Sequence, residues 1–262
     1  MLADSAEMLA GTVNDVEDPT AIDSTISMLL IQQGFNVQVT GERGSTLLHY
    51  MANCGYAALF AVLIELNLEV NRQNDDGRTP LYFATNQRKH HFMKLLLRAG
   101  ANPNLLCDNN LRSVLFYAPL CGHELVVNIL LERGANIENT DIEGRTPLAG
   151  AARNGHAEVV LRLLEKGACP EPEDRRGKTS LLLAAMKGYS NTIAVLLPYG
   201  VNVNKVDSYH RTALSLAAER GSTALIRLLL RQPGNEVDHP DATGRTPLVW
   251  VVRAGNVQAV QL

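Results

Sequence analysis

The sequence predicts an all-α solenoid, in which short helix–turn–helix units stack on one another and are joined by β-hairpin-like loops. Three observations carry this prediction. Hydroxyl residues that suit a helix N-cap recur at nearly constant intervals, glycines recur where helices should end, and apolar residues recur at helical spacing between them. One pair of such short helices cannot bury its apolar face alone, so the pairs must stack.

Residues 141–171 show the beginning of the repeated unit most clearly. Asp141 and Gly144 suit the first and last positions of a type I turn. Thr146 then offers a hydroxyl N-cap, and Pro147 suits the first helical position because its missing N–H is not needed there. A short first helix should therefore start at Pro147.

The second half of the unit predicts another short helix. Gly155 can adopt the left-handed conformation that ends the first helix, and a second helix should run from about Glu158 to Lys166. One face of this second helix is apolar at helical period and is formed by Val159, Val160, Leu163 and Leu164.

The capping hydroxyl recurs seven times, with gaps of 33, 34, 33, 33, 33 and 34 residues, and these positions number the repeats one to seven: Thr46, Thr79, Ser113, Thr146, Thr179, Thr212 and Thr246. A period of this length with Thr-Pro-Leu, Ala-Ala and Gly-His landmarks resembles the ankyrin repeat. The landmarks are Thr79-Pro80-Leu81, Thr146-Pro147-Leu148, Ala151-Ala152, Gly155-His156, Ala184-Ala185 and Thr246-Pro247-Leu248. The resemblance covers nearly the whole chain and implies a curved array with a concave groove.

The first 40 residues lack the Thr-Pro-Leu landmark but keep an apolar run that ends at Gly34. Gly34 lies 12 residues before Thr46, and the same interval separates a glycine from Thr146. We therefore expect residues 1–40 to form a degenerate N-terminal capping repeat. Residues 41–262 should hold seven repeats, the last of them truncated.

Cysteine usage and hydropathy indicate the compartment. The four cysteines, Cys54, Cys107, Cys121 and Cys169, show no paired spacing, and no secretory signal precedes them. No stretch approaches the length needed to span a membrane. We expect a cytoplasmic or nuclear protein without a membrane span.

The net charge of −3 conceals an uneven distribution. Residues 1–42 carry seven acidic and no basic side chains, which leaves 24 basic against 20 acidic residues in the rest of the chain. An acidic N-terminal segment thus precedes a mildly basic remainder of the chain. Total charge near neutral, without a basic and aromatic-rich patch, argues against a nucleic-acid partner.

Motifs that carry chemistry are absent from the sequence. It contains no Gly-x-Gly-x-x-Gly, no Gly-Lys-Ser/Thr at Walker-type spacing, no His-Glu-x-x-His and no Gly-x-Ser-x-Gly. His123 and His156 lie one repeat apart and could suggest a metal pair, but zinc needs four convergent ligands. A structural hydrogen-bonding role for both histidines is the stronger interpretation. We expect no catalytic site, no cofactor and no metal.

The resemblance implies that turn tips and first helices line a groove in which partners bind. The residue before the capping hydroxyl is a cation in six successive repeats, and further cations lie in the turn of repeat five and near the ends of first helices. Together they predict a basic stripe along repeats four to seven that suits an acidic partner segment. The predicted partner-binding residues are Arg112, Arg145, Arg153, Arg175, Arg176, Lys178, Lys187, Tyr209, Arg211, Arg220, Arg245, Leu105 and Leu106.

A second interpretation of the same cations carries about equal weight. Gly-Arg-Thr-Pro is a frequent spelling of this motif, and its arginines could simply pair with turn aspartates of the same array. Those aspartates are Asp141, Asp174, Asp207 and Asp241.

Apolar and aromatic residues offer further candidates. The tip formed by Leu105, Leu106 and Cys107 with Leu111 is either a second contact or folds onto neighbouring repeats. Tyr209 and His210 replace the usual turn residues of repeat six and could reach into the groove. Phe83 and Phe116 should pack in the core, while Tyr82 and Trp250 have an exposed anchor as a less favoured alternative.

The expected function is a non-catalytic protein-interaction scaffold or adaptor that binds a partner through the concave groove. The alternatives are a regulatory part of a larger enzyme, or an array with an unrecognised catalytic site. We expect a monomer unless the truncated C-terminal end self-associates.

Overall fold

A computed structural model describes residues 41–55, 57, 60, 69–120 and 122–262. The predicted capping repeat at residues 1–40 lies outside the described residues. The chain divides into two compact units. The first unit comprises Met1–Tyr117 and Ile129–Asn136, and the second comprises Ala118–Asn128 and Ile137–Leu262.

The described part of the first unit follows the predicted helical repeat. Its elements are the 3₁₀ turn η1 (Glu42–Gly44) and the helices α3 (Leu47–Cys54), α5 (Pro80–Asn86) and α6 (His90–Arg98). Helix α3 packs on α5, and α5 packs on α6. The core between them contains Leu81, Phe92 and Leu96, each at most 1% exposed.

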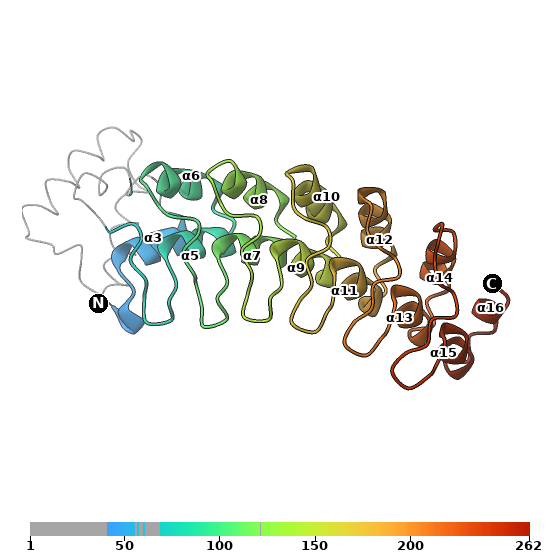
Figure 1. Cartoon of the computed structure of the whole chain (residues 1–262). Helices are drawn as coiled ribbons and strands as arrows, with labels where there is room; N and C mark the ends of the chain where they lie inside the picture. The colour runs from blue at the N-terminus through green and yellow to red at the C-terminus, as the bar shows by residue number, and fades with distance from the viewer. Residues whose placement is uncertain (1–40, 56, 58–59, 61–68, 121) are drawn as a thin grey trace, which may run out of the picture. The chain divides into compact units, whose positions relative to one another are not determined.

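The second unit contains two rows of stacked helices (Figure 1). The first helices of its repeats are α9 (Pro147–Asn154), α11 (Ser180–Lys187), α13 (Ala213–Glu219) and α15 (Pro247–Arg253). The second helices are α10 (Ala157–Glu165), α12 (Ser190–Leu196) with the 3₁₀ turn η3 (Leu197–Tyr199), α14 (Thr223–Leu230) and α16 (Val257–Val260). Within each row every helix packs on the next one. Helices α7 (Val114–Leu120) and α8 (Glu124–Leu131) contribute residues to both units.

Local capping explains why these helices begin and end where they do. The Thr146 hydroxyl accepts the Ala149 N–H at 3.3 Å, and Pro147 is the first residue of α9. Gly155 ends α9 in the left-handed conformation, with φ 78°. Helix α10 starts and ends within one residue of the predicted bounds. The capping predictions are confirmed.

Small side chains allow the first helices of the second unit to approach one another closely. The paired alanines of these helices are fully buried, each 0% exposed: Ala151, Ala152, Ala184, Ala185, Ala217 and Ala218. The predicted apolar face of α10 is also buried, with Val160 and Leu163 at 0%. The all-helical repeat fold predicted from the period is confirmed.

The loops between repeats close like β-hairpins. The Asp141 N–H donates to the Arg145 carbonyl at 3.0 Å. Neighbouring turn tips of the second unit are joined by further backbone hydrogen bonds of 2.9 Å each, from Arg175 to Glu143, from Ser208 to Arg176 and from Ala242 to Tyr209. In the described part of the chain the assigned β pairing is the isolated antiparallel bridge between Leu106 and Ser113. The turn tips of the second unit therefore form a hydrogen-bonded row.

Candidate functional site

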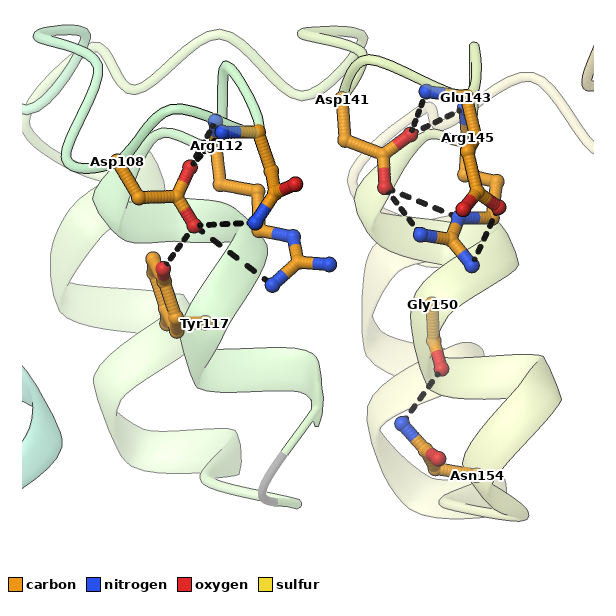
Figure 2. Close-up of polar contacts among 9 residues, drawn as sticks. Asp108, Arg112, Tyr117, Asp141, Glu143, Arg145, Gly150 and Asn154 are labelled. Carbon is orange, nitrogen blue, oxygen red and sulfur yellow. Dashed lines mark hydrogen bonds and ion pairs between the residues drawn. The ribbon is translucent and has the colours of Figure 1, made fainter.

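The turn of repeat four shows how the cation before its capping hydroxyl is held. One carboxylate oxygen of Asp141 accepts the N–H groups of Glu143 and Arg145 at 2.9 and 3.0 Å (Figure 2). The other oxygen accepts Nε and Nη2 of Arg145 at 2.9 and 2.6 Å. This two-pronged ion pair leaves Arg145 only 6% exposed. The charge of Arg145 is therefore matched inside the turn, and partner binding by Arg145 stays a prediction.

Repeat six repeats this arrangement. Asp207 accepts the backbone N–H groups of Tyr209 and Arg211 and also binds the Arg211 side chain, with Nη2 at 2.7 Å. The Arg211 side chain is 21% exposed, whereas that of Asp207 is fully buried. The second interpretation of the sequence, in which turn arginines pair with turn aspartates, is confirmed for Arg145 and Arg211.

The other cations at this position are held in different ways. Lys178 is 7% exposed, and its ammonium reaches the Met186 sulfur at 3.9 Å. Partner binding by Lys178 stays a prediction. The guanidinium of Arg245 lies 5.1 Å from the centre of the Trp250 ring. Arg112 lies 3.6 Å from Asp108 and beside the rings of Phe116 and Tyr117.

The turn carboxylates carry perturbed pKa values. Burial alone would raise the Asp241 pKa, but hydrogen bonds from Thr243, Arg245 and Trp250 together lower it to about 2. Burial also opposes ionisation of Asp108, and the hydrogen bond from the Tyr117 hydroxyl is the largest of those that lower its pKa. Burial, followed by the same hydrogen bond, raises the pKa of Tyr117 (Figure 2). The hydrogen bonds therefore favour ionised carboxylates at Asp108 and Asp241 and a neutral phenol at Tyr117.

Other predicted cations remain at the surface of the second unit. Arg153, Lys187, Arg220 and Arg253 lie at the C-terminal ends of the first helices, and we call them the helix-end row. Arg175 and Arg176 are exposed at the turn tip of repeat five. None of these six forms an ion pair with a carboxylate among the described residues. Arg220 instead donates from Nη1 to the Met186 carbonyl at 3.1 Å.

The apolar tip predicted in repeat three is only partly exposed. Leu106 is 41% and Leu111 45% exposed, while Leu105 is half-buried. Cys107 is fully buried, and burial raises the pKa of its thiol to about 12. The tip therefore folds down at Cys107, and partner binding by Leu105 and Leu106 stays a prediction.

Comparison with known protein families identifies the repeat. The family described as "Ankyrin repeats (3 copies)" matches residues 21–106, 48–141, 88–174, 133–207 and 181–262. The chain belongs to the ankyrin repeat family. Ankyrin repeats are protein-interaction modules, so the comparison assigns this array to a broad class of binding proteins.

Curated relatives of this ankyrin repeat chain match only part of it. It is 34% identical over 114 residues to NF-kappa-B inhibitor delta of Mus musculus, which covers 41% of this chain and 34% of that protein. It is 31% identical over 118 residues to the nuclear factor NF-kappa-B p105 subunit of Gallus gallus, covering 43% of this chain and 12% of that protein. It is 35% identical over 69 residues to the ADP-ribosylation factor GTPase-activating protein AGD4 of Arabidopsis thaliana, covering 26% and 9%.

The chain therefore spans between 9% and 34% of the length of these three relatives. Their named activities differ. The similarity to these relatives therefore supports the ankyrin repeat and does not indicate one particular activity.

The motif histidine of repeat four, His156, has a structural hydrogen bond. His156 places Nε2 3.0 Å from the Leu120 carbonyl, one repeat earlier in the second unit. Among the described residues there is no group of three or more His, Cys, Asp or Glu side chains that could hold a metal ion. The structural interpretation of His156 is confirmed.

The length and composition of the described helices show whether any of them could cross a membrane. In the described stretches, no helix combines the length and the apolar composition that crossing a membrane requires.

A cleft in the first unit escaped the sequence analysis. It is lined by Ser45 before α3, by His49, Tyr50 and Asn53 on α3, and by Phe83 on α5. Phe83, predicted as core, is half-buried and lines this cleft, while the predicted core residue Phe116 is 1% exposed. The exposed-anchor alternative is wrong for Tyr82, which is 8% exposed. A one-dimensional period cannot show that the ring at Phe83 faces an opening.

His49 is fixed on both sides within the first unit. Its Nδ1 accepts the Thr46 N–H at 3.0 Å, and its Nε2 lies 3.0 Å from the Arg78 carbonyl, so the neutral ring carries its proton on Nε2. Burial lowers the pKa of His49, and the hydrogen bond to Arg78 only partly opposes this effect. A second proton on Nδ1 would face the Thr46 N–H.

Proposed function

We propose that this ankyrin array is a non-catalytic scaffold or adaptor that binds an acidic segment of a partner protein through the second unit. The observation that carries the proposal is the helix-end row. Arg153, Lys187, Arg220 and Arg253 lie at equivalent ends of successive first helices, without a carboxylate partner among the described residues. Packed helices are spaced by roughly 10 Å, so these cations would meet acidic side chains at regular intervals along one segment.

A role in stabilising the helices is the competing explanation of this row. Cations near a helix C-terminus interact favourably with the helix dipole, by about 0.3–1 kcal/mol each. That role predicts a change in stability and no change in binding. Measuring both partner binding and stability in the same variants distinguishes the two roles.

The test reverses three charges of the helix-end row. Partner proteins are captured from the native source with wild-type protein and with the variant R153E/K187E/R220E, at low and at high salt. The matched control is K166E/R227E/R231E, which makes the same change in charge on exposed cations on or just after the second helices. We expect the first variant to lose a salt-sensitive partner that the control retains. Equal capture by both variants, or capture indifferent to salt, would contradict the proposal.

The alternative is a regulatory part of a larger enzyme. Its support is that the chain matches only 9% of a GTPase-activating protein. Turnover by the isolated array, in an activity screen of the purified chain, would remove the non-catalytic proposal.

We further propose a cytoplasmic or nuclear setting, which the free thiols of Cys54, Cys107 and Cys169 support. A monomeric state and the absence of a nucleic-acid partner belong to the same proposal.

A further inference from the structure

One turn tip of the second unit places an unusual residue at a position of positive φ. The fourth turn residue has positive φ in every repeat of this unit and is glycine in three of them, Gly144, Gly177 and Gly244. In repeat six it is His210, with φ 56°. An L-residue with a side chain is strained in this conformation, and glycine is not.

Nothing within the described part of the chain explains why His210 is kept there. Its backbone N–H donates to the Asp207 carbonyl at 2.8 Å, a bond that Gly144 and Gly244 also make in their own turns. Its side chain is exposed, and the ring forms no hydrogen bond or ion pair with a described residue. The backbone of His210 is strained, and no internal contact of its side chain offsets that strain. This combination points to a contact with a group outside the chain.

The neighbouring side chains show what that contact would be. Tyr209 is 54% exposed, and the Arg211 guanidinium lies 5.1 Å from its ring centre, which holds the ring in place. The Ser208 N–H donates to the Arg176 carbonyl at 2.9 Å, so the exposed pair Arg175 and Arg176 belongs to the adjoining tip. Three turn carboxylates beside them have partners. Asp207 binds Arg211, Glu143 lies 3.0 Å from Arg145, and Asp174 accepts the backbone N–H groups of Arg176 and Lys178.

We call Arg175, Arg176, Tyr209 and His210 the tip cluster. Its two guanidinium groups carry only hydrogen-bond donors and form two-pronged bonds with carboxylates. Its imidazole can donate as well, and the phenol ring offers an apolar face. The combination suits an anionic group next to an apolar side chain.

We infer that the tip cluster is the anchor that recognises an acidic partner segment, with carboxylates on Arg175, Arg176 and His210 and an apolar side chain against Tyr209. This inference rests on the proposed function and assigns its specificity to one pair of adjacent turns. The helix-end row then adds long-range attraction, while the tip cluster makes the close contacts.

The test uses a labelled short peptide of alternating Glu and Phe and its counterpart with Gln in place of Glu. Direct binding and thermal unfolding are measured for wild-type protein and for H210G. Because glycine relieves the strain, H210G should raise Tm by about 2–4 °C and at the same time weaken binding of the Glu peptide about fivefold or more. If the His210 side chain had only a structural role, the H210G variant would not gain stability and lose binding at the same time.

Two further variants complete the design. R88G also replaces a residue of positive φ, 55°, by glycine and removes a full charge from the first unit, so it should leave binding unchanged. R175Q/R176Q removes the guanidinium pair at an exposed tip and should weaken binding at least as much as H210G.

Two results would overturn the inference: wild-type protein that binds the Glu and Gln peptides equally, or H210G and R175Q/R176Q variants with unchanged affinity. The proposed function stands in those cases if reversal of the helix-end row still abolishes capture of a native partner. If that reversal has no effect either, the proposed function fails as well.

Discussion

The turns of repeats two and four begin with different side chains, the amide of Asn74 and the carboxylate of Asp141, and each side chain closes its own turn. In the first unit, Asn74 closes the turn by accepting the N–H groups of Asp76 and Arg78 at 3.1 and 2.9 Å. In the second unit, Asp141 does the same for its own turn and also binds the arginine side chain. Both side chains can form the turn, but only the carboxylate can neutralise a buried guanidinium.

The two arginines accordingly lie in different surroundings. The side chain of Arg78 is 38% exposed, and its guanidinium lies 5.2 Å from the Tyr82 ring centre. The side chain of Arg145 is 7% exposed. The same Arg-Thr-Pro spelling therefore gives a surface cation in one unit and a structural ion pair in the other.

The largest expected effect comes from exchanging the two turn residues. Asp141→Asn keeps an oxygen for the backbone N–H groups but leaves the Arg145 guanidinium with only the exposed Glu143 as a counter-charge. We expect a loss of about 3 kcal/mol in the free energy of unfolding, measured with urea. The matched change in the first unit, Asn74→Asp, should alter it by less than about 1 kcal/mol. Equal effects of the two changes would remove the distinction between the turns.

A second expected effect concerns the interiors of the two units. Thr85 and Ala185 occupy the same position in the first helices of repeats two and five, at 1% and 0% exposure. The Thr85 hydroxyl oxygen is buried without a hydrogen-bond partner among the described residues. Thr85→Val should therefore stabilise the chain by about 0.5–1 kcal/mol, whereas Ala185→Val should overpack and cost about 1–3 kcal/mol. Calorimetry of both variants checks the opposite signs, and two destabilised variants would show that repeat two is packed as tightly as repeat five.

The smallest expected effect is a different response of the two units to pH. The folded-state pKa of His49 lies below its ordinary value of 6.5, so the unfolded chain takes up the proton first and stability falls as pH drops below about 6.5. The Asp241 pKa is lowered from 3.8 to about 2, so its contribution is present above pH 3.8 and is lost only as pH falls toward 2.

Hydrogen exchange measures this response separately in each unit. Between pH 7 and pH 5, once intrinsic exchange rates are corrected, protection should fall in the first unit and hold in the second. His49→Gln should remove the difference, and a pH response that persists in this variant would assign it to another group.

Local signals in the sequence predicted most of the fold. Thr146 and Gly155 act through bonds within a few residues, so their roles in capping α9 could be derived from spacing alone. The period then required stacking, because each short helix pair leaves an apolar face uncovered.

The candidate site was less predictable because burial is a property of three-dimensional surroundings. The sequence left two interpretations open for the cations that precede the capping hydroxyls. Arg145 and Lys178 are both buried, Arg145 because it pairs with Asp141 and Lys178 because it lies beside Met186. Both types of contact join residues four to eight positions apart, but their strength depends on side-chain packing that no spacing rule gives. The cleft beside Phe83 was missed for the same reason.

A double-mutant cycle on Asp141 and Arg145 tests the central claim most directly, which is that the Asp141 carboxylate holds the Arg145 guanidinium inside the turn. Urea unfolding of D141N, R145M and the double variant gives the coupling energy between the two side chains. The account predicts a coupling of about 2–3 kcal/mol, against less than about 0.5 kcal/mol for the same cycle on Asn74 and Arg78 in the first unit. A coupling near zero for Asp141 and Arg145, or equal values for the two turns, would contradict it.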